Sequence, residues 1–177
     1  YRLAGIEPQL RPMELGSAAV FGAVEAMILP TSHDCRESAA WRLTAPEGRV
    51  GYLTDTGHVV EETGEKLLGA DLLVLESNHD VEKLLAGPYP YPLKKRILGD
   101  SGHLSNDAAA AYAVRSVRAG TRSILLAHLS DENNTPQLAL GAVGEALSEA
   151  GLNVSLAAAP RDGVSEAYIL EDAVCSA

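Results

Sequence analysis

The stretch Gly51-Tyr52-Leu53-Thr54-Asp55-Thr56-Gly57 is a short apolar run that ends on a carboxylate. Residues 50–53 are apolar and β-prone and follow a Pro/Gly turn at 46–48, so they predict a buried strand. Open α/β sheets keep their functional sites at the carboxyl ends of their strands. The sequence therefore predicts that Asp55 lies at such a site.

Two further predicted strands end in the same way. Residues 72–75 run directly into Glu76, and residues 124–127 run into His128. Polar residues that follow scaffold strands are positioned for binding or catalysis more often than for packing. Three apolar strands that each end in a histidine or a carboxylate are typical of a functional site.

Length and composition predict a single globular domain. The 177 residues are enough to bury a core, and 46% hydrophobic with 21% charged residues is ordinary for such a domain. One Trp and one Phe require that the core be largely aliphatic. No stretch resembles a membrane span or a signal peptide, so we expect no membrane partner.

The charge balance limits the partners. The chain has 24 Asp and Glu against 14 Lys and Arg, a formal net charge of −10, which argues against a generic basic nucleic-acid surface. It leaves a nucleic acid substrate open, because a metal site supplies positive potential locally. The one dense basic cluster is 94–96. Cys35 and Cys175 are too few for a disulfide framework, which predicts a cytoplasmic protein.

The remaining pattern predicts a layered α/β domain. Residues 1–10 are expected to be a loop or a frayed helix end. The three segments 11–14, 18–20 and 23–29 predict a β-meander, and two helices are expected after the caps Ser105 and Thr135. The other expected elements are strands at 40–44, 50–53, 72–75, 123–127, 153–158 and 167–170, and helices near 59–68, 81–85, 93–98, 106–119 and 136–150.

Three residues are candidate metal ligands: His33, Asp55 and His128. Imidazole nitrogens and carboxylate oxygens suit zinc, manganese or iron, and Asp55 is the candidate bridge between two ions. Each residue also has an ordinary explanation. His33 fits a loop histidine, Asp55 fits the N-cap of a helix near Val59, and His128 fits a polar strand tip bonded to backbone. Three side chains do not hold two ions, and the chain has no H-x-H-x-D-H run.

His103 is a candidate acid. It lies on a Gly-rich loop before a predicted helix N-terminus, where the dipole favours an anionic oxygen, so it is placed to protonate a leaving alkoxide. The alternative is a loop histidine bonded to backbone. Glu76 is predicted to orient a metal-bound histidine, with a solvated strand end as the alternative. His79 is expected behind the ligands or facing substrate, and His58 on the first turn of a helix.

Several polar and aromatic residues are candidates for a substrate groove. Tyr89 and Tyr91 are suited to stack on bases, and Asn133 and Asn134 follow His128 closely. Ordinary turn and surface packing explains each of them equally well.

Six motifs in one order carry a family resemblance. They are PTSHD at 30–34, LTDTG at 53–57, LESNHD at 75–80, GPYP at 87–90, GHLSN at 102–106 and AHLSDENNTP at 127–136. In this order they resemble the YycJ/WalJ family of metallo-β-lactamase-fold hydrolases, relatives of RNase Z and of the phosphodiesterase PhnP. The resemblance runs from about Leu10 to the end of the chain.

The resemblance implies an αββα sandwich with a binuclear site that holds two zinc or manganese ions. Carried over by position, His33 ligates one metal, Asp55 bridges both and His128 ligates the other. His103 matches the proposed proton donor to the leaving oxygen. Residues Glu76, Asn78, His79, Asn106 and Asn134 lie behind the ligands or face substrate. The implied activity is 5′-to-3′ exonuclease hydrolysis of DNA, with RNA or a small phosphodiester left open.

The sequence departs from the family pattern because H-x-H-x-D-H is absent. We therefore expect that residues 1–177 are the C-terminal portion of a metallo-β-lactamase-fold domain, an incomplete sandwich that is inactive alone. An uncovered sheet edge then favours a homodimer or exchange between chains. The alternatives to a nuclease are a non-catalytic half-domain that dimerises or complements a partner, and a small-molecule cyclic phosphodiesterase.

Overall fold

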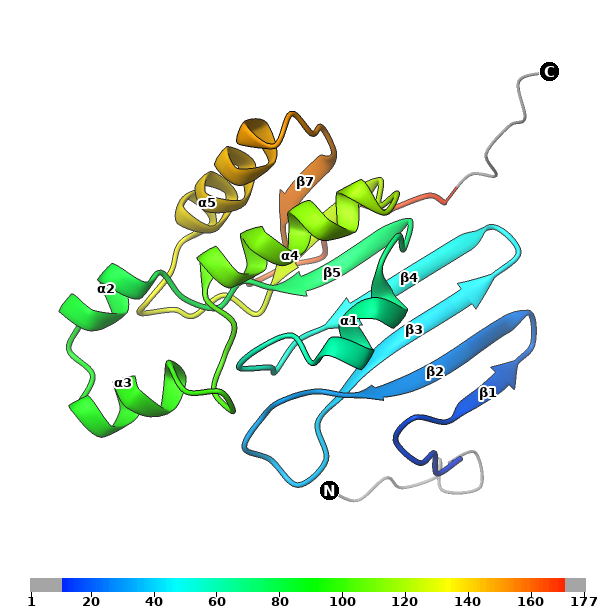
Figure 1. Cartoon of the computed structure of the whole chain (residues 1–177), viewed down its shortest axis with the longest axis horizontal. Helices are drawn as coiled ribbons and strands as arrows, with labels where there is room; N and C mark the ends of the chain where they lie inside the picture. The colour runs from blue at the N-terminus through cyan, green and yellow to red at the C-terminus, as the bar shows by residue number, and fades with distance from the viewer. Residues whose placement is uncertain (1–10, 171–177) are drawn as a thin grey trace.

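The computed structural model describes residues 11–170, which form one seven-stranded sheet with helices packed on one face (Figure 1). The strands follow sequence order across the sheet. Strands β1 to β4 pair antiparallel, and β4 to β7 pair parallel. The strands are β1 (Ala18–Phe21), β2 (Val24–Pro30), β3 (Ala39–Ala45), β4 (Gly48–Leu53), β5 (Leu72–Glu76), β6 (Ser123–Ala127) and β7 (Ser155–Ala158).

Five helices connect or flank the parallel strands. They are α1 (Glu61–Leu67), α2 (Val81–Ala86), α3 (Tyr91–Ile97), α4 (Asn106–Arg118) and α5 (Pro136–Glu149). Ser105 caps α4 by accepting from Ala108 N, and Thr135 caps α5 by accepting from Leu138 N, as predicted. Pro136 follows at the first helical position. Helices α2 and α3 extend beyond the sheet edge (Figure 1).

The core lies between the sheet and α1, α4 and α5. The first four residues of strand β5 are apolar, and Leu72, Leu73 and Leu75 are buried. The largest fully buried side chains include Leu29, Leu53, Leu73, Leu75, Ile124 and Leu126 from the strands. The predicted aliphatic core is confirmed, since the aromatic member of the buried cluster is Tyr112 on α4.

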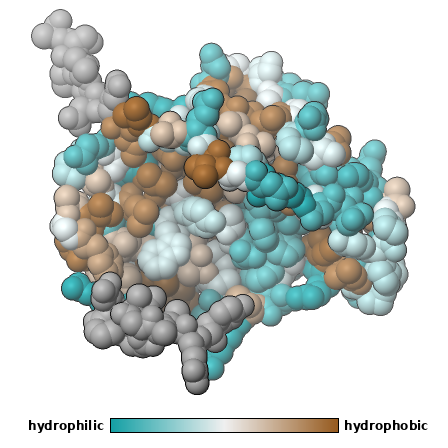
Figure 2. All heavy atoms as spheres, turned by 180° about the vertical axis from the view of Figure 1, so that it is seen from behind, coloured by the Kyte–Doolittle hydropathy of each residue, from teal (hydrophilic) through white to brown (hydrophobic). Residues whose placement is uncertain are grey.

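The opposite face of the sheet is also apolar. Side chains alternate between faces along a strand, and the strand register places Trp41 beside Ile28 and beside Tyr52, which is 42% exposed. The row continues across β5 and β6 through Val74 and Leu125. Seen from this side, hydrophobic residues gather over the sheet (Figure 2).

The α/β class is confirmed, and several local predictions are corrected. Residues 11–14 and 167–170 form no strand, so the meander begins at β1 rather than at residue 11, and 167–170 do not pair with β7. Helix α1 begins at Glu61, with the apolar Val59 and Val60 before it. Residues 1–10 lie outside the described residues. The described part of the chain holds one sheet and its helices, and the other half of the predicted αββα sandwich is not found in it.

No helix among residues 11–170 is both long and apolar enough to cross a membrane.

The loop before α4 packs tightly against the end of α3. His103 N donates to Ile97 O at 3.0 Å, and Gly102 N donates to Gly99 O at 2.8 Å. A Cβ at Gly102 would lie 2.2 Å from Ile97 O and 2.3 Å from Arg96 O. Glycine is therefore required at 102 by close backbone approach, and this contact fixes the loop that carries His103.

We predict that Gly102→Ala lowers the free energy of unfolding by about 1–3 kcal/mol because the added methyl overpacks the loop. Gly141→Ala in α5 is the control: no atom lies within 4 Å of its added Cβ, and the substitution raises helix propensity by about 1 kcal/mol. Urea unfolding followed by circular dichroism measures both. Equal shifts in the two variants would contradict the assignment of tight packing at 102.

Candidate active site

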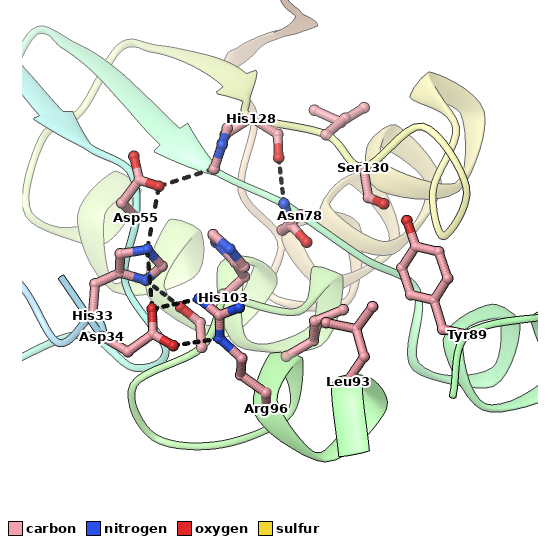
Figure 3. Close-up of a pocket in the computed structure, with 13 residues that line it drawn as sticks. His33, Asp34, Asp55, Asn78, Tyr89, Leu93, Arg96, His103, His128 and Ser130 are labelled. Atoms are coloured by element: carbon pink, nitrogen blue, oxygen red, sulfur yellow. Dashed lines mark hydrogen bonds and ion pairs between the residues drawn. The ribbon is translucent and has the colours of Figure 1, made fainter. Parts of the chain in front are cut away.

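Four strand ends deliver the candidate residues to one edge of the sheet. Asp55 follows β4, Glu76 ends β5 and His128 follows β6, and these parallel strands point the same way. Strand β2 is antiparallel to β3, which is antiparallel to β4, so β2 runs in the direction of β4 and brings His33 to the same edge. His103 arrives from the loop before α4 (Figure 3).

Asp55 lies between the two outer histidines. Its Oδ1 is 3.8 Å from His33 Nε2 and 3.8 Å from His128 Nδ1 (Figure 3). Two groups of side chains could hold a metal ion, and within each group the possible ligand atoms all lie within 4.8 Å of one another. The first group is His33, Asp55 and His103, and the second is Glu76, His103 and His128. The structure therefore brings together all the predicted ligands and the predicted acid.

Two of these residues hold an unfavourable backbone conformation. Asp55 has φ 54° and His128 has φ 57°, and they are the non-glycine residues with positive φ in the described chain. Such conformations cost about 1–2 kcal/mol and persist where the surroundings enforce them. Thr31 Oγ1 donates to Asp55 O at 2.8 Å, and Asn78 Nδ2 donates to His128 O at 2.8 Å. These bonds hold both side chains at the edge.

Glu76 is a buried anchor beneath the histidines. Its side chain is fully buried, its Oε1 lies 2.8 Å from both His103 Nδ1 and His128 Nδ1, and its Oε2 accepts from Thr56 N at 2.9 Å. Burial alone would raise the pKa of Glu76, but the hydrogen bonds from His103, His128 and Thr56 outweigh it and lower the pKa. Glu76 is therefore an ionised carboxylate that orients two imidazoles.

The hydrogen bonds fix which ring nitrogen faces the site. His33 Nδ1 lies 2.9 Å from Gly102 O, which only accepts, so Nδ1 carries the proton and Nε2 is left with a lone pair. Glu76 likewise takes the Nδ1–H groups of His103 and His128. The hydrogen bond to Glu76 also raises the pKa of His128, against the effect of burial. Metal-binding histidines in proteins are oriented in this manner.

The predicted asparagines support the site from within. Asn106 and Asn134 are buried and bonded to each other, with Asn134 Nδ2 donating to Asn106 Oδ1 at 2.9 Å and to Ser77 O at 2.7 Å. Ser77 Oγ completes the network by donating to Asn106 Oδ1 at 2.6 Å. The network joins the ends of β5 and β6 to the start of α4.

The other two histidines do not belong to the groups of possible metal donors. His79 is 1% exposed, and in the described structure neither of its ring nitrogens has a hydrogen-bond partner. Burial lowers its pKa, so it is a neutral core residue that does not face solvent. His58 precedes α1 rather than lying on its first turn, with Nδ1 3.0 Å from Asp100 O. The N-cap position of α1 is Val60, which excludes that alternative for Asp55.

A cavity of about 430 Å³ opens above the donors. His33, Asp55, His103 and His128 line one side of it. The cavity is also lined by residues that the sequence did not single out for the site: Asp34, Leu93, Arg96, Ile97, Leu129 and Ser130. The sequence signals that could have pointed to these residues were the basic cluster at 94–96 and the aspartate after His33. Only the fold shows that Asp34 and Arg96 line the same cavity.

The donor set fits a divalent metal. Two imidazole nitrogens and one carboxylate form a ligand set that zinc uses in hydrolytic sites, and Asp55 lies at equal distances from both histidines. The buried Glu76 supplies the supporting hydrogen bonds that such ligands require.

The fold and the site define a metallo-β-lactamase-type domain, and the chain belongs to the beta-lactamase superfamily domain family, which matches residues 2–129. Two curated relatives carry a more specific name. The chain is 36% identical over 158 residues to exodeoxyribonuclease YycJ of Bacillus anthracis, and 37% identical over 143 residues to exodeoxyribonuclease WalJ of Streptococcus pneumoniae. These matches cover 89% and 81% of this chain.

The chain spans about half the length of these relatives, 56% and 53%. Among solved structures, the metallo-beta-lactamase fold protein YhfI from Bacillus subtilis matches with a TM-score of 0.63, 19% identity, and coverage of 87% of this chain and 54% of that one. At this identity the match supports the fold alone. The predicted family resemblance is confirmed.

We predict that Glu76→Gln lowers the pKa of His128 in the metal-free protein, because the carboxylate that stabilises the imidazolium is removed. The raised folded-state pKa means that this stabilisation is present below about pH 6.5 and is lost as pH rises through the folded value. NMR titration of the histidine side chains measures the shift. Glu145→Gln on the exposed face of α5 is the control, and an unchanged His128 titration in Glu76→Gln would disprove the coupling.

Proposed function

We propose that this chain carries the catalytic edge of a metal-dependent phosphodiester hydrolase, with 5′-to-3′ exonuclease action on DNA as its specific activity. The observation that carries the proposal is the gathering of imidazole and carboxylate donors at one edge of the sheet, where Asp55 Oδ1 lies 3.8 Å from His33 Nε2, the nitrogen that keeps its lone pair. The name exodeoxyribonuclease of both curated relatives supports the substrate.

The metal ligands in this proposal are His33, Asp55 and His128. Divalent ions at these residues, zinc or manganese, neutralise phosphate charge and activate water when bound. We propose two ions that share Asp55, since one histidine lies on each side of its carboxylate. The described residues complete the coordination of one ion more readily than of two, because three side chains supply the donors.

His103 is the proposed proton donor. Its Nδ1 is held by Glu76 at 2.8 Å, so Nε2 is the nitrogen left to exchange a proton with substrate. When the P–O bond breaks, the leaving oxygen takes the proton from His103, whose ring the buried carboxylate of Glu76 orients. The ring is tilted against His33, with centroids 4.8 Å apart, which keeps it beside the ligands.

A second candidate function is a non-catalytic assembly module. The apolar second face of the sheet, with Trp41 and the 42% exposed Tyr52, favours this alternative. A dimer measured by sedimentation together with absent metal binding would support it.

A cyclic phosphodiesterase is distinguished by faster turnover of a cyclic nucleotide than of 5′-phosphorylated single-stranded DNA. A cytoplasmic location stays a prediction from cysteine content.

We predict that the full-length protein binds Zn²⁺ or Mn²⁺, and that Asp55→Ala in it lowers metal content and phosphodiester turnover by more than about 100-fold, because loss of a shared metal ligand has a larger effect than loss of a residue that only supports a ligand. Metal analysis after dialysis, and hydrolysis of 5′-phosphorylated single-stranded DNA, measure the two quantities. Chelation of the wild type is expected to abolish turnover reversibly.

Asp107→Ala is the matched control because Asp107 is an exposed carboxylate on the first turn of α4. It removes the same charge and is expected to leave metal content and turnover unchanged. Wild-type metal content or turnover in a folded Asp55→Ala protein would remove Asp55 from the mechanism.

A further inference from the structure

The cavity at the sheet edge has a second side that the proposed hydrolysis does not use. Its wall comes from the segment that joins α2 to α3 and from α3 itself, through Tyr89, Leu93, Arg96 and Ile97. This wall faces the donor side across the cavity (Figure 3). A phosphodiester held at the donors would therefore extend its substituents toward α3.

Arg96 places a cation beside the metal-type donors without joining them. Its Nε and Nη2 both donate to the carboxylate of Asp34, with Nη2 3.0 Å from Oδ1. Asp34 Oδ1 lies 3.7 Å from His33 Nε2, so one oxygen contacts both the candidate ligand and the guanidinium. The hydrogen bond from Arg96 lowers the pKa of Asp34, which keeps this carboxylate ionised.

Arg96 retains capacity for an anion. Its side chain is 64% exposed. A guanidinium has five N–H donors, and among the described residues Arg96 uses its Nε and Nη2 donors on Asp34. Within residues 11–170 it is the one lysine or arginine that lines the cavity. The planar fork of arginine matches two oxygens of a phosphate, as it here matches two oxygens of Asp34.

The neighbouring basic residues have different positions. Lys94 Nζ donates to Leu85 O and Gly87 O, at 2.6 and 2.7 Å, and so caps the end of α2. Lys95 is exposed and does not line the cavity. Of the three residues in this cluster, Arg96 alone faces the site.

Tyr89 supplies an aromatic surface on the same wall. It is half-buried, and its hydroxyl points toward Ser130, which follows the His128 strand end (Figure 3). The ring thus lies across the cavity from the donor cluster, at a position where a base attached to the reacting phosphate would pass. Base stacking on such rings is tolerant of sequence.

We propose that Tyr89 and Arg96 form a nucleotide subsite. Arg96 binds the phosphate next to the scissile one, and the Tyr89 ring stacks on the base of the nucleotide that joins these two phosphates. The subsite rests on the proposed phosphodiesterase function and deepens it, because it selects a nucleotide chain over a diester with a single phosphate. Asp34 holds the guanidinium in its bound orientation before substrate arrives, which lowers the ordering cost of binding.

The test compares Arg96→Ala with Lys95→Ala, which removes the same charge from the next residue of the same helix. Two substrates are used: a 5′-phosphorylated oligothymidylate, and methyl 4-nitrophenyl phosphate, which has one phosphate and no base. We expect Arg96→Ala to raise KM for the oligonucleotide about 10- to 100-fold with little change in kcat. Lys95→Ala should change KM by less than about 2-fold on either substrate, and Arg96→Ala should lose much less on the small diester than on the oligonucleotide.

Tyr89 is tested with a conservative pair of variants. Tyr89→Ala is expected to raise KM for the oligonucleotide about 10-fold through loss of stacking, while Tyr89→Phe keeps the ring and stays near wild type. Equal losses in both variants would mean that the hydroxyl, not the ring, contacts substrate and would overturn the stacking assignment.

A binding measurement keeps this inference separate from the activity itself. Fluorescence anisotropy with the labelled oligothymidylate is measured against salt, and Arg96→Ala should reduce the slope of log K on log salt by about 0.7. If the wild type hydrolyses neither substrate, the proposed function fails and anisotropy still decides the subsite. Equal affinities of Arg96→Ala and Lys95→Ala for the oligothymidylate would overturn the subsite. It would also be overturned if Arg96→Ala lost as much activity on the small diester as on the oligonucleotide, because Arg96 would then be a positioning residue for His33.

Discussion

The site depends on one buried carboxylate. Glu76 ends the central strand β5 with no exposed side-chain surface, and it accepts hydrogen bonds from two imidazoles and one backbone N–H. An unpaired carboxylate is costly to bury, so this residue is stable only while His103, His128 and Thr56 surround it. The same bonds set the direction in which both imidazoles present their free nitrogens. Core stability and site geometry are therefore one constraint.

The sheet supplies the rest of the geometry. Because β2, β4, β5 and β6 run in the same direction, their carboxyl ends gather His33, Asp55, Glu76 and His128 at one edge. Left-handed backbone at Asp55 and His128 and the tight approach at Gly102 then hold these loops in place. The helices that cover one face of the sheet bury the aliphatic core and leave this edge open to the cavity.

The acidic side chains at the cavity are balanced locally. A net charge of −10 disfavours broad binding of nucleic acid, and the cavity itself contains two carboxylates, Asp34 and Asp55. Each has a defined counterpart, since Arg96 pairs with Asp34 and the histidines flank Asp55. Positive charge at the cavity is thereby local, and Arg96 is the lysine or arginine of the described residues that lines it.

The sequence by itself determined the α/β class, the strands that end in Asp55, Glu76 and His128, and the capped helices α4 and α5. These features are local: apolar runs, a cap and a proline at the first turn specify them without long-range information. The errors also lay in local pattern, since 11–14 and 167–170 were predicted as strands from short segments and form none. The predicted donors lie at one edge of the sheet in the structure, while their contacts were beyond what spacing specifies.

Only the tertiary structure decided which residues meet. Asp34 and Arg96 are far apart in the chain, yet they share a two-pronged hydrogen bond at the cavity, and Asn106 and Asn134 became buried supports rather than substrate contacts. His79, which the motif suggested for the site, became a core residue. The physical reason is that side-chain partners depend on how loops from separate strands fold over one edge, which no local periodicity encodes.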